Sequence, residues 1–158
     1  MADNAPSLAV GDIATPLAQS LVVSCRTAVG ASSPVQKGDI INITGAQNVT
    51  DLSFVAEVGL ASAADTAVFG VAIDNAFGGS ASAKWTIAVC IHGIVKVTAT
   101  AAAIAKGAIV TAGGGSTGAS LVITMASGIV SATTLATMLG YAITDFGSSD
   151  SGLIFILK

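Results

Sequence analysis

The sequence predicts an all-β protein, and three observations support this prediction. Apolar residues recur at every second position from Trp85 to Thr98, which is the period of a β-strand. Short patterns from the first half of the chain return in the second half at a nearly constant spacing. Glycine, serine and threonine repeatedly interrupt the apolar sequence, so that apolar runs stay short. Together these observations predict short strands that pack in one closed sheet system.

The segment from Trp85 to Thr98 is expected to be the central one, because repeated patterns flank it on both sides. At about 3.3 Å per residue, a strand of this length would span roughly 45 Å, more than twice the usual strand length. A glycine inside a strand permits a bulge or a kink. Gly93 is therefore expected to divide the segment into two shorter strands, with the same alternation of faces continuing from one to the other. His92 is expected to cap the kink.

The internal repeat predicts two similar units of about residues 36–89 and 105–157. Two copies are too few for a solenoid, so the units should pack on each other within one sheet system. Their offsets differ by one residue either way, which indicates loops of slightly different length. The matching pairs are Lys37-Gly38 with Lys106-Gly107 (offset 69), Gly70–Ile73 with Gly140–Ile143 (70), Phe77-Gly78 with Phe146-Gly147 (69) and Trp85–Val89 with Leu153–Leu157 (68).

The remaining elements follow from local patterns. Residues 1–20 contain Pro6, Pro16 and little periodicity, which is typical of an extended arm or of a frayed terminus, and residues 21–158 form a single β domain. Two Ala/Thr-rich segments, Thr98–Lys106 and Ser131–Leu139, are expected to form helices of one or two turns. The other expected strands are Leu21–Val29, Ile40–Thr44, Phe54–Leu60, Ala67–Ile73, Ala108–Ala112, Leu121–Met125 and Leu153–Leu157.

The composition excludes several classes of function. Hydrophobic residues make up 53% of the 158 residues, yet no uninterrupted apolar stretch is long enough for a membrane-spanning helix. The first residues lack the basic and apolar regions of a secretory signal. A net charge of −3, with six scattered basic residues, gives no basic surface for nucleic acid. Charged residues are 9% of the chain, which favours a surface largely covered by neighbours in an assembly.

Chemical motifs in the chain do not form a site. Cys25 and Cys90 are expected to be two reduced thiols, and His92 is the only histidine, which excludes a histidine metal cluster. The loop Gly113–Gly118 matches G-x-G-x-x-G, and it matches G-x-S-x-G around Ser116. Both motifs need a following helix, whereas the sequence after this loop is strand-like. We therefore expect no catalytic residue, no cofactor, no metal site and no enzyme activity.

Several motifs in fixed order make the chain resemble the capsid cement, or head decoration, proteins of tailed bacteriophages. The resemblance extends from about Val35 to Lys158. The motifs are K-G-D-I-I at Lys37–Ile41, F-G-V-A-I at Phe69–Ile73, H-G-I-V-K-V at His92–Val97, A-K-G-A-I-V at Ala105–Val110, L-G-Y-A-I at Leu139–Ile143 and L-I-F-I-L at Leu153–Leu157. The resemblance implies a small β-barrel or β-tulip-like domain without enzyme activity.

The resemblance also implies a location and partners. It implies binding to the major capsid protein on the outside of the mature capsid, often as a homotrimer, and stabilisation of the shell. Many weak contacts at repeated sites would suffice for such binding. We expect no binding to nucleic acid or to membranes. The alternatives are another structural or adhesive β-module of a virion, such as a fibre, tail or surface subunit, and an enzyme or ligand-binding barrel that depends on Ser116 or His92.

The N-terminal arm is the segment expected to contact the shell. An extended segment can add hydrogen bonds along an exposed edge of a neighbouring subunit. The residues of this predicted capsid-binding segment are Ala2, Asp3, Asn4, Ala5, Pro6, Ser7, Leu8, Ala9, Val10, Gly11, Asp12, Ile13, Ala14 and Thr15.

Overall fold

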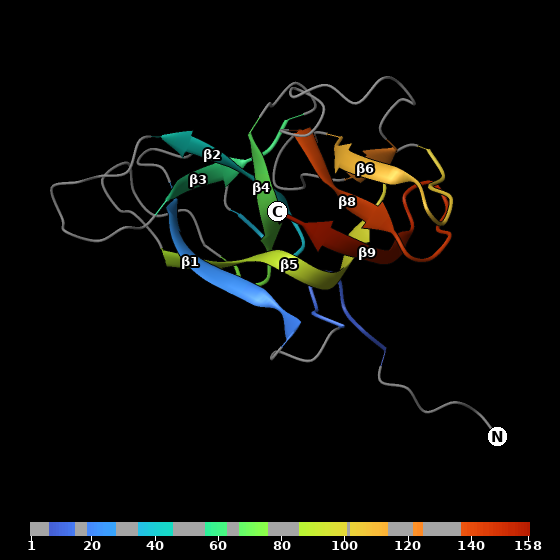
Figure 1. Ribbon diagram of the computed structural model, residues 1–158, viewed down its shortest axis with the longest axis horizontal. Coiled ribbons are helices and arrows are strands. Elements are labelled where there is room, and N and C mark those ends of the chain that lie inside the picture. The colour runs from blue at the N-terminus through green and yellow to red at the C-terminus, as the bar shows by residue number, and fades with distance from the viewer. Residues whose placement is uncertain are drawn as a thin grey trace, which may run out of the picture.

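The computed structural model describes residues 7–14, 19–27, 35–45, 56–62, 67–75, 86–100, 102–113, 122–124 and 137–158. Within these ranges the chain forms nine strands and no helix, which confirms the predicted all-β class. The strands join in one sheet, in the order β1-β3-β2-β4-β5-β9-β8-β6-β7 (Figure 1). Their bounds are β1 Leu21–Thr27, β2 Ile40–Gly45, β3 Glu57–Leu60, β4 Val68–Ala72, β5 Thr86–Thr98, β6 Ile109–Ala112, β7 Val122–Thr124, β8 Met138–Ala142 and β9 Ser151–Leu157.

The N-terminal part of the sheet closes into a five-stranded barrel. Strand β1 pairs with β5 in an antiparallel register, with Cys25 opposite Ile87. It also pairs with β3 in parallel, with Arg26 opposite Glu57. The order β1-β3-β2-β4-β5 therefore returns to β1, which confirms the predicted barrel. Strands β9, β8, β6 and β7 extend the sheet beyond it, on the right-hand side of Figure 1.

Strand β5 links the barrel to the remaining strands. Its first half, Thr86–His92, pairs with β1, and its second half, His92–Thr98, pairs with β9. The prediction of two shorter strands is wrong, because partners along both halves hold the segment in one strand of 13 residues. Gly93 lies near the junction with a φ of 132°, and the β1 register shifts beside it, between Leu21 and Val22. The irregularity changes the partners of β5 without ending the strand.

The sheet contains the same pairing pattern twice. The N-terminal unit consists of β1–β4 and residues 86–92 of β5, and its strands follow the order β1-β5-β4-β2-β3. The C-terminal unit consists of residues 92–98 of β5 and β6–β9, and its order is β5-β9-β8-β6-β7. The second half of β5 therefore has the role in the C-terminal unit that β1 has in the N-terminal unit.

Hydrogen bonds fix which residues of the two units are equivalent. The Ile73 amide donates to the Ala88 carbonyl at 3.0 Å, and the Ile143 amide donates to the Leu153 carbonyl at 2.8 Å. Because Ile143 follows Ile73 at offset 70, Leu153 is equivalent to Ala88 at offset 65. The predicted offset of 68 for this strand is wrong by three residues. An odd shift matters, because it would turn the opposite face of the strand toward the core.

The two Lys-Gly turns at the start of β2 and β6 have the same geometry. The Gly38 amide donates to the Ala72 carbonyl at 2.7 Å, and the Gly107 amide donates to the Ala142 carbonyl at 2.8 Å. Gly38 has a φ of 94° and Gly107 a φ of 83°, which is the left-handed region that favours glycine. The short Lys-Gly pattern in the sequence therefore marks a repeated turn.

Buried apolar residues form two clusters. The first fills the barrel: Cys25, Val35, Ile41, Val58, Ala72, Ile87 and Val89. The second joins the outer side of the N-terminal unit to the inner side of the C-terminal unit, and its members include Ile40, Val71, Cys90, Val95, Val97, Ile104, Val110, Leu139, Phe146, Ile154 and Ile156. Strand β5 contributes to both clusters, and its odd-numbered positions are mostly buried, as its alternation predicts. The second cluster is therefore the interface through which the two units pack.

One of the two predicted helices is wrong, and the other lies mostly outside the described residues. Within Thr98–Lys106, Ile104 forms a β-bridge with Phe146, so this part of the segment is extended. In Ser131–Leu139, residues 131–136 lie outside the described residues, and the end of the segment belongs to β8. Alanine content predicts helix only weakly, and backbone pairing with distant strands outweighs that preference here.

Candidate functional site

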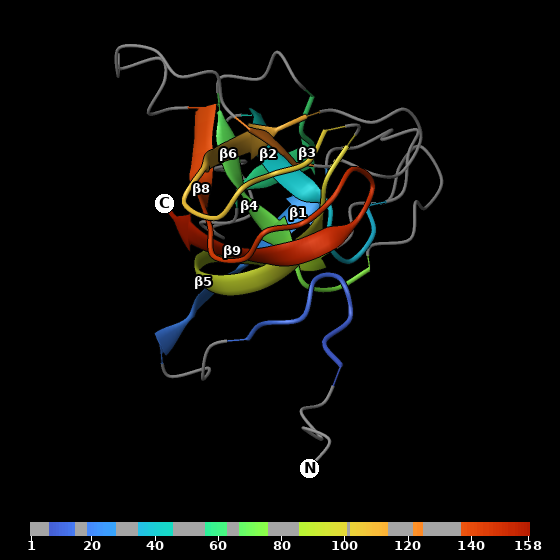
Figure 2. The ribbon, with the colours of Figure 1, turned by 90° about the vertical axis from the view of Figure 1, so that its right-hand side faces the viewer.

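Residues 7–14 of the N-terminal arm lie against their own domain. The Gly11 amide donates to the Lys96 carbonyl at 2.7 Å, and the Lys96 amide donates to the Asp12 carbonyl at 3.1 Å. The Ala14 amide donates to the Ile94 carbonyl at 2.7 Å. Figure 2 shows this segment, in blue, running beneath β5. Of the predicted capsid-binding residues, Ala2–Pro6 and Thr15 lie outside the described residues.

Side chains add to this contact. The ammonium group of Lys37 forms an ion pair with the carboxylate of Asp12, and the Lys96 ammonium donates to the Leu8 carbonyl at 2.7 Å. The hydrogen bond from Lys37 lowers the pKa of Asp12 below its ordinary value of 3.8, and a bond from the Ala9 amide acts in the same direction. The two lysines thus connect the arm to the Lys-Gly turn of the N-terminal unit and to β5.

The arm binds to the second half of β5 along the edge that β9 leaves open, as β3 binds to β1 in the barrel along the edge that β5 leaves open. In the N-terminal unit, one edge of β1 pairs with β5 and the other pairs with β3, through a bond from the Arg26 amide to the Ala56 carbonyl at 2.9 Å. In the C-terminal unit, the second half of β5 pairs with β9 along one edge, and the arm bonds to the other at Ile94 and Lys96. Among the described residues, no pairing joins β5 to β7. The arm therefore covers the edge of β5 in the C-terminal unit that is equivalent to the edge at which the barrel of the N-terminal unit closes.

A second surface feature, which the sequence analysis did not identify, is an exposed apolar patch on the outer face of the C-terminal unit. It is called the outer patch below and consists of His92, Ile94, Tyr141, Phe155 and Leu157, together with Leu21 at the adjoining start of β1. His92 on β5 lies opposite Leu21 on β1 and opposite Leu157 on β9, so these three residues form one row across the sheet. In the adjacent row, Tyr141 on β8 lies opposite Phe155 on β9. The rings of His92 and Phe155 connect the two rows by an edge-to-face contact, with 5.1 Å between the ring centroids.

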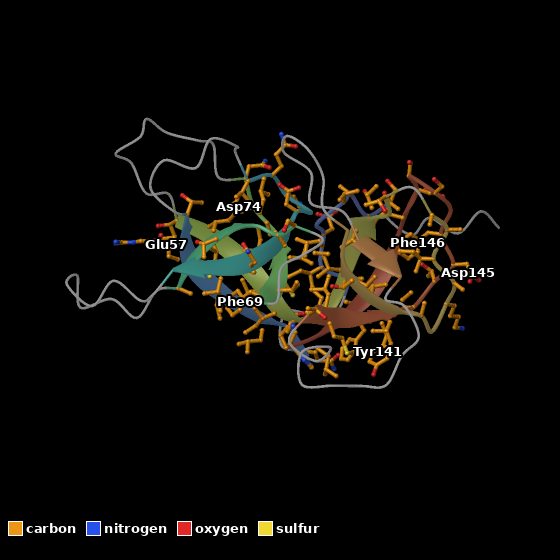
Figure 3. The ribbon with its side chains drawn as sticks, turned by 90° about the horizontal axis from the view of Figure 1, so that it is seen from above. Glu57, Phe69, Asp74, Tyr141, Asp145 and Phe146 are labelled. Carbon is orange, nitrogen blue, oxygen red and sulfur yellow. The ribbon has the colours of Figure 1, made fainter. Side chains whose placement is uncertain are left out.

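The outer patch exposes large side chains to solvent. Leu21 is 52% exposed, Leu157 48% and Tyr141 40%. Tyr141 lies at the surface, on the side that faces the viewer in Figure 1 (Figure 3). His92 packs on Phe155 rather than serving the predicted role of a kink cap. The sequence does contain the signal, because β9 is apolar on both faces although its partners can cover one of them.

The groups singled out for chemistry do not converge. Cys25 and Cys90 are buried and unlinked, and burial raises the pKa of the Cys25 thiol to about 11 and also raises the pKa of Cys90. Within the described ranges, His, Cys, Asp and Glu side chains form no group of three that could hold a metal ion. Ser116 lies outside the described residues, and the segment after its loop is strand β7 rather than a helix.

The end of the C-terminal unit contains a shallow hollow of about 490 Å³ beside Asp145 and Asp150. Asp145 and Phe146, which both line it, lie close to each other at one end of the molecule in Figure 3. Both carboxylates accept hydrogen bonds from backbone amides. Asp145 accepts from the Lys106 amide at 2.7 Å, and Asp150 accepts from the Ser151 amide at 2.7 Å. These bonds hold the Lys-Gly turn and the start of β9. No helix in the described part of the chain is long and apolar enough to cross a membrane.

Comparison with known proteins gives a fold. The chain matches no protein-family model and no curated protein. Among solved structures it is similar to the N base of the head fiber gp8.5 of bacteriophage phi29, with a TM-score of 0.52 and 14% sequence identity. The two chains share a fold. The similarity covers 87% of this chain and 94% of the phi29 chain, so it includes strands from both units.

Proposed function

We propose that this chain is a structural protein of a tailed-bacteriophage head that attaches to the outside of the shell and stabilises it as a cement protein. The observation that supports it best is the fold shared with a phi29 head fiber base along nearly the whole of both chains. The cement-like motifs point to the same class of protein. In this proposal the chain binds the major capsid protein as a homotrimer and has no enzyme activity.

The physical character of the chain fits attachment to a repeated lattice. Charged residues are 9% of the sequence, and large apolar side chains remain exposed on the outer patch. Contacts of this kind are individually weak, but a shell presents the same site many times. The arm residues Ala2–Thr15 stay part of the proposal as a second contact with shell subunits, with residues 7–14 also bonded to their own domain.

A second candidate is the base of a head fibre. The phi29 neighbour is itself described as the base of a head fiber, which favours this role directly. A fibre base and a cement protein both attach to the outside of the head. They differ in what the attachment does, because a fibre base displays further chain and a cement protein strengthens the shell.

The test is to band virus particles of the source phage on a density gradient and measure this chain by quantitative mass spectrometry. Under the proposal, the 15.3 kDa chain co-migrates with intact heads in amounts comparable to the major shell protein. Particles made without it should release DNA at lower temperature than complete particles. Presence on heads with unchanged thermal release of DNA would favour the fibre base. Absence from heads would reject both candidates.

A further inference from the structure

Two residues of the outer patch, Tyr141 and Phe155, have equivalents in the N-terminal unit that are completely covered. Hydrogen-bond register makes Val71 equivalent to Tyr141, and Cys90 equivalent to Phe155. Val71 and Cys90 are 0% exposed, because they pack in the cluster that joins the two units. Tyr141 is 40% exposed. At these two positions, the same face of the repeated unit is therefore an internal interface in one copy and lies at the surface in the other.

The residues that pair with Val71 and with Tyr141 differ in exposure in the same way. Ile40 pairs with Val71 and is fully buried, whereas its equivalent Ile109 pairs with Tyr141 and is partly exposed. An exposed apolar surface costs free energy in water, and contiguous patches of this kind on a folded domain commonly mark an interaction site. The repeat thus indicates that this face of the unit is suited to packing against another apolar surface.

The size of the patch restricts its occupant. Three side chains about half exposed present on the order of 300 Å² of apolar surface. A stable interface between two proteins buries about 800 Å² on each partner. The patch alone is too small to hold a second copy of this chain in solution. The proposed homotrimer carries three copies of the patch, so a partner that presents the complementary site many times can bind them together, and avidity then compensates for weak single contacts.

We infer that the outer patch, centred on Tyr141 and Leu157, is a contact surface for an apolar site on the outer face of the head shell. The inference rests on the proposed function and assigns the shell-binding face of the domain. A shell meets this requirement, because any one site on its outer face recurs across the lattice. The ring of Tyr141 offers a large rigid contact area with a hydroxyl that can reach a polar rim.

The test compares three purified chains on heads that lack this protein. The variant Tyr141→Thr/Leu157→Thr removes the patch, and Ile43→Thr removes another exposed apolar residue, 42% exposed on β2. Threonine keeps the preference for strand at all three positions. Co-sedimentation should show binding of the unchanged chain and of Ile43→Thr, and at least tenfold weaker binding of the double variant. Thermal unfolding should stay similar in all three.

Each of the other outcomes would reject the proposed function, the inference about the outer patch, or both. No binding of the unchanged chain would reject the proposed function together with this inference. Equal binding of the double variant would reject the patch as the contact and leave the proposed function standing. If light scattering shows that the double variant loses an oligomer formed by the unchanged chain, the patch joins copies of this chain, and the inference is overturned.

Discussion

The N-terminal and C-terminal units have the same strand pairing, yet they bury their apolar faces in different ways. The N-terminal unit closes through β1 and β3, and its outer face is covered by the C-terminal unit. In the C-terminal unit the edge of β5 is covered by the arm, and the outer face remains exposed. The comparison shows that one duplicated pattern can supply an internal interface in one copy and an exposed apolar surface in the other.

The largest expected effect is a loss of stability when alanine replaces Gly70 in the N-terminal unit or Gly140 in the C-terminal unit, because each glycine lies close to the backbone of the adjacent strand. A Cβ atom at Gly140 would lie 1.9 Å from the Phe155 carbonyl oxygen, and one at Gly70 would lie 2.4 Å from that of Cys90. Because both obstacles are backbone atoms, neither can move cheaply. Gly140→Ala and Gly70→Ala should each lower the free energy of unfolding by about 3 kcal/mol or more, measured by urea denaturation.

Gly147→Ala is the matched control, because the nearest atom outside its chain neighbours lies at an ordinary 3.7 Å. If either interior glycine accepts alanine as easily as Gly147 does, the equivalence of the two close approaches is contradicted.

An intermediate effect separates the two Lys-Gly turns. Alanine at either glycine is strained by the positive φ, which costs about 1 kcal/mol. At Gly38 a Cβ would also meet Val10 of the arm at 2.3 Å, whereas at Gly107 a Cβ would have no atom within 4 Å other than those of its chain neighbours. Gly38→Ala should therefore destabilise by about 2 kcal/mol and Gly107→Ala by about 1 kcal/mol, as measured by chemical denaturation.

The difference between these turns should disappear when the arm is removed. In a chain that lacks residues 1–14, the two substitutions are expected to cost the same, because the strained φ is then their shared effect. A difference that persists without the arm would show that the arm does not distinguish the two turns.

The smallest effect concerns pH and the docking of the arm. The folded state lowers the pKa of Asp12 below its ordinary 3.8, so the ion pair with Lys37 stabilises the arm above that pH. The stabilisation should be lost as the pH falls through the lowered pKa. Hydrogen exchange of the Gly11 amide, which donates to Lys96, reports arm docking. Its protection should fall below pH 3.8 in the unchanged chain.

Asp12→Asn provides the control, because it removes the titrating group. Its Gly11 protection should be lower at neutral pH and should lack this pH-dependent loss. The same acid-induced loss in Asp12→Asn would assign the pH dependence to another group.

Part of the fold could be predicted from single residues and their spacing. Alternation predicted most of the strands, and the Lys-Gly pairs identified two turns that share the same hydrogen bonds. The helix expected at Thr98–Lys106 is absent, because pairing of Ile104 with Phe146 depends on residues far away in the sequence. The role of β5 was missed for the same reason, since its two halves pair with strands from opposite ends of the chain.

The candidate sites show the same division. The sequence singled out the arm, and the structure places Gly11 and Asp12 against β5 and the Lys37 turn. The outer patch escaped notice because Tyr141 and Val71 occupy equivalent positions in similar motifs. The motif around each residue does not show which of the two is exposed, and the available signal lay in the strand paired with Tyr141, because β9 is apolar on both faces.

The sequence by itself determined the all-β class, the repeated turns and the two apolar faces of the strands. These features depend on side-chain alternation and on glycine geometry, which act over a few residues. The tertiary structure alone decided the register of β9, the closure of one unit and the exposure of Tyr141. These depend on which distant strand pairs with which edge and on which layer covers which face, and local alternation leaves both choices open.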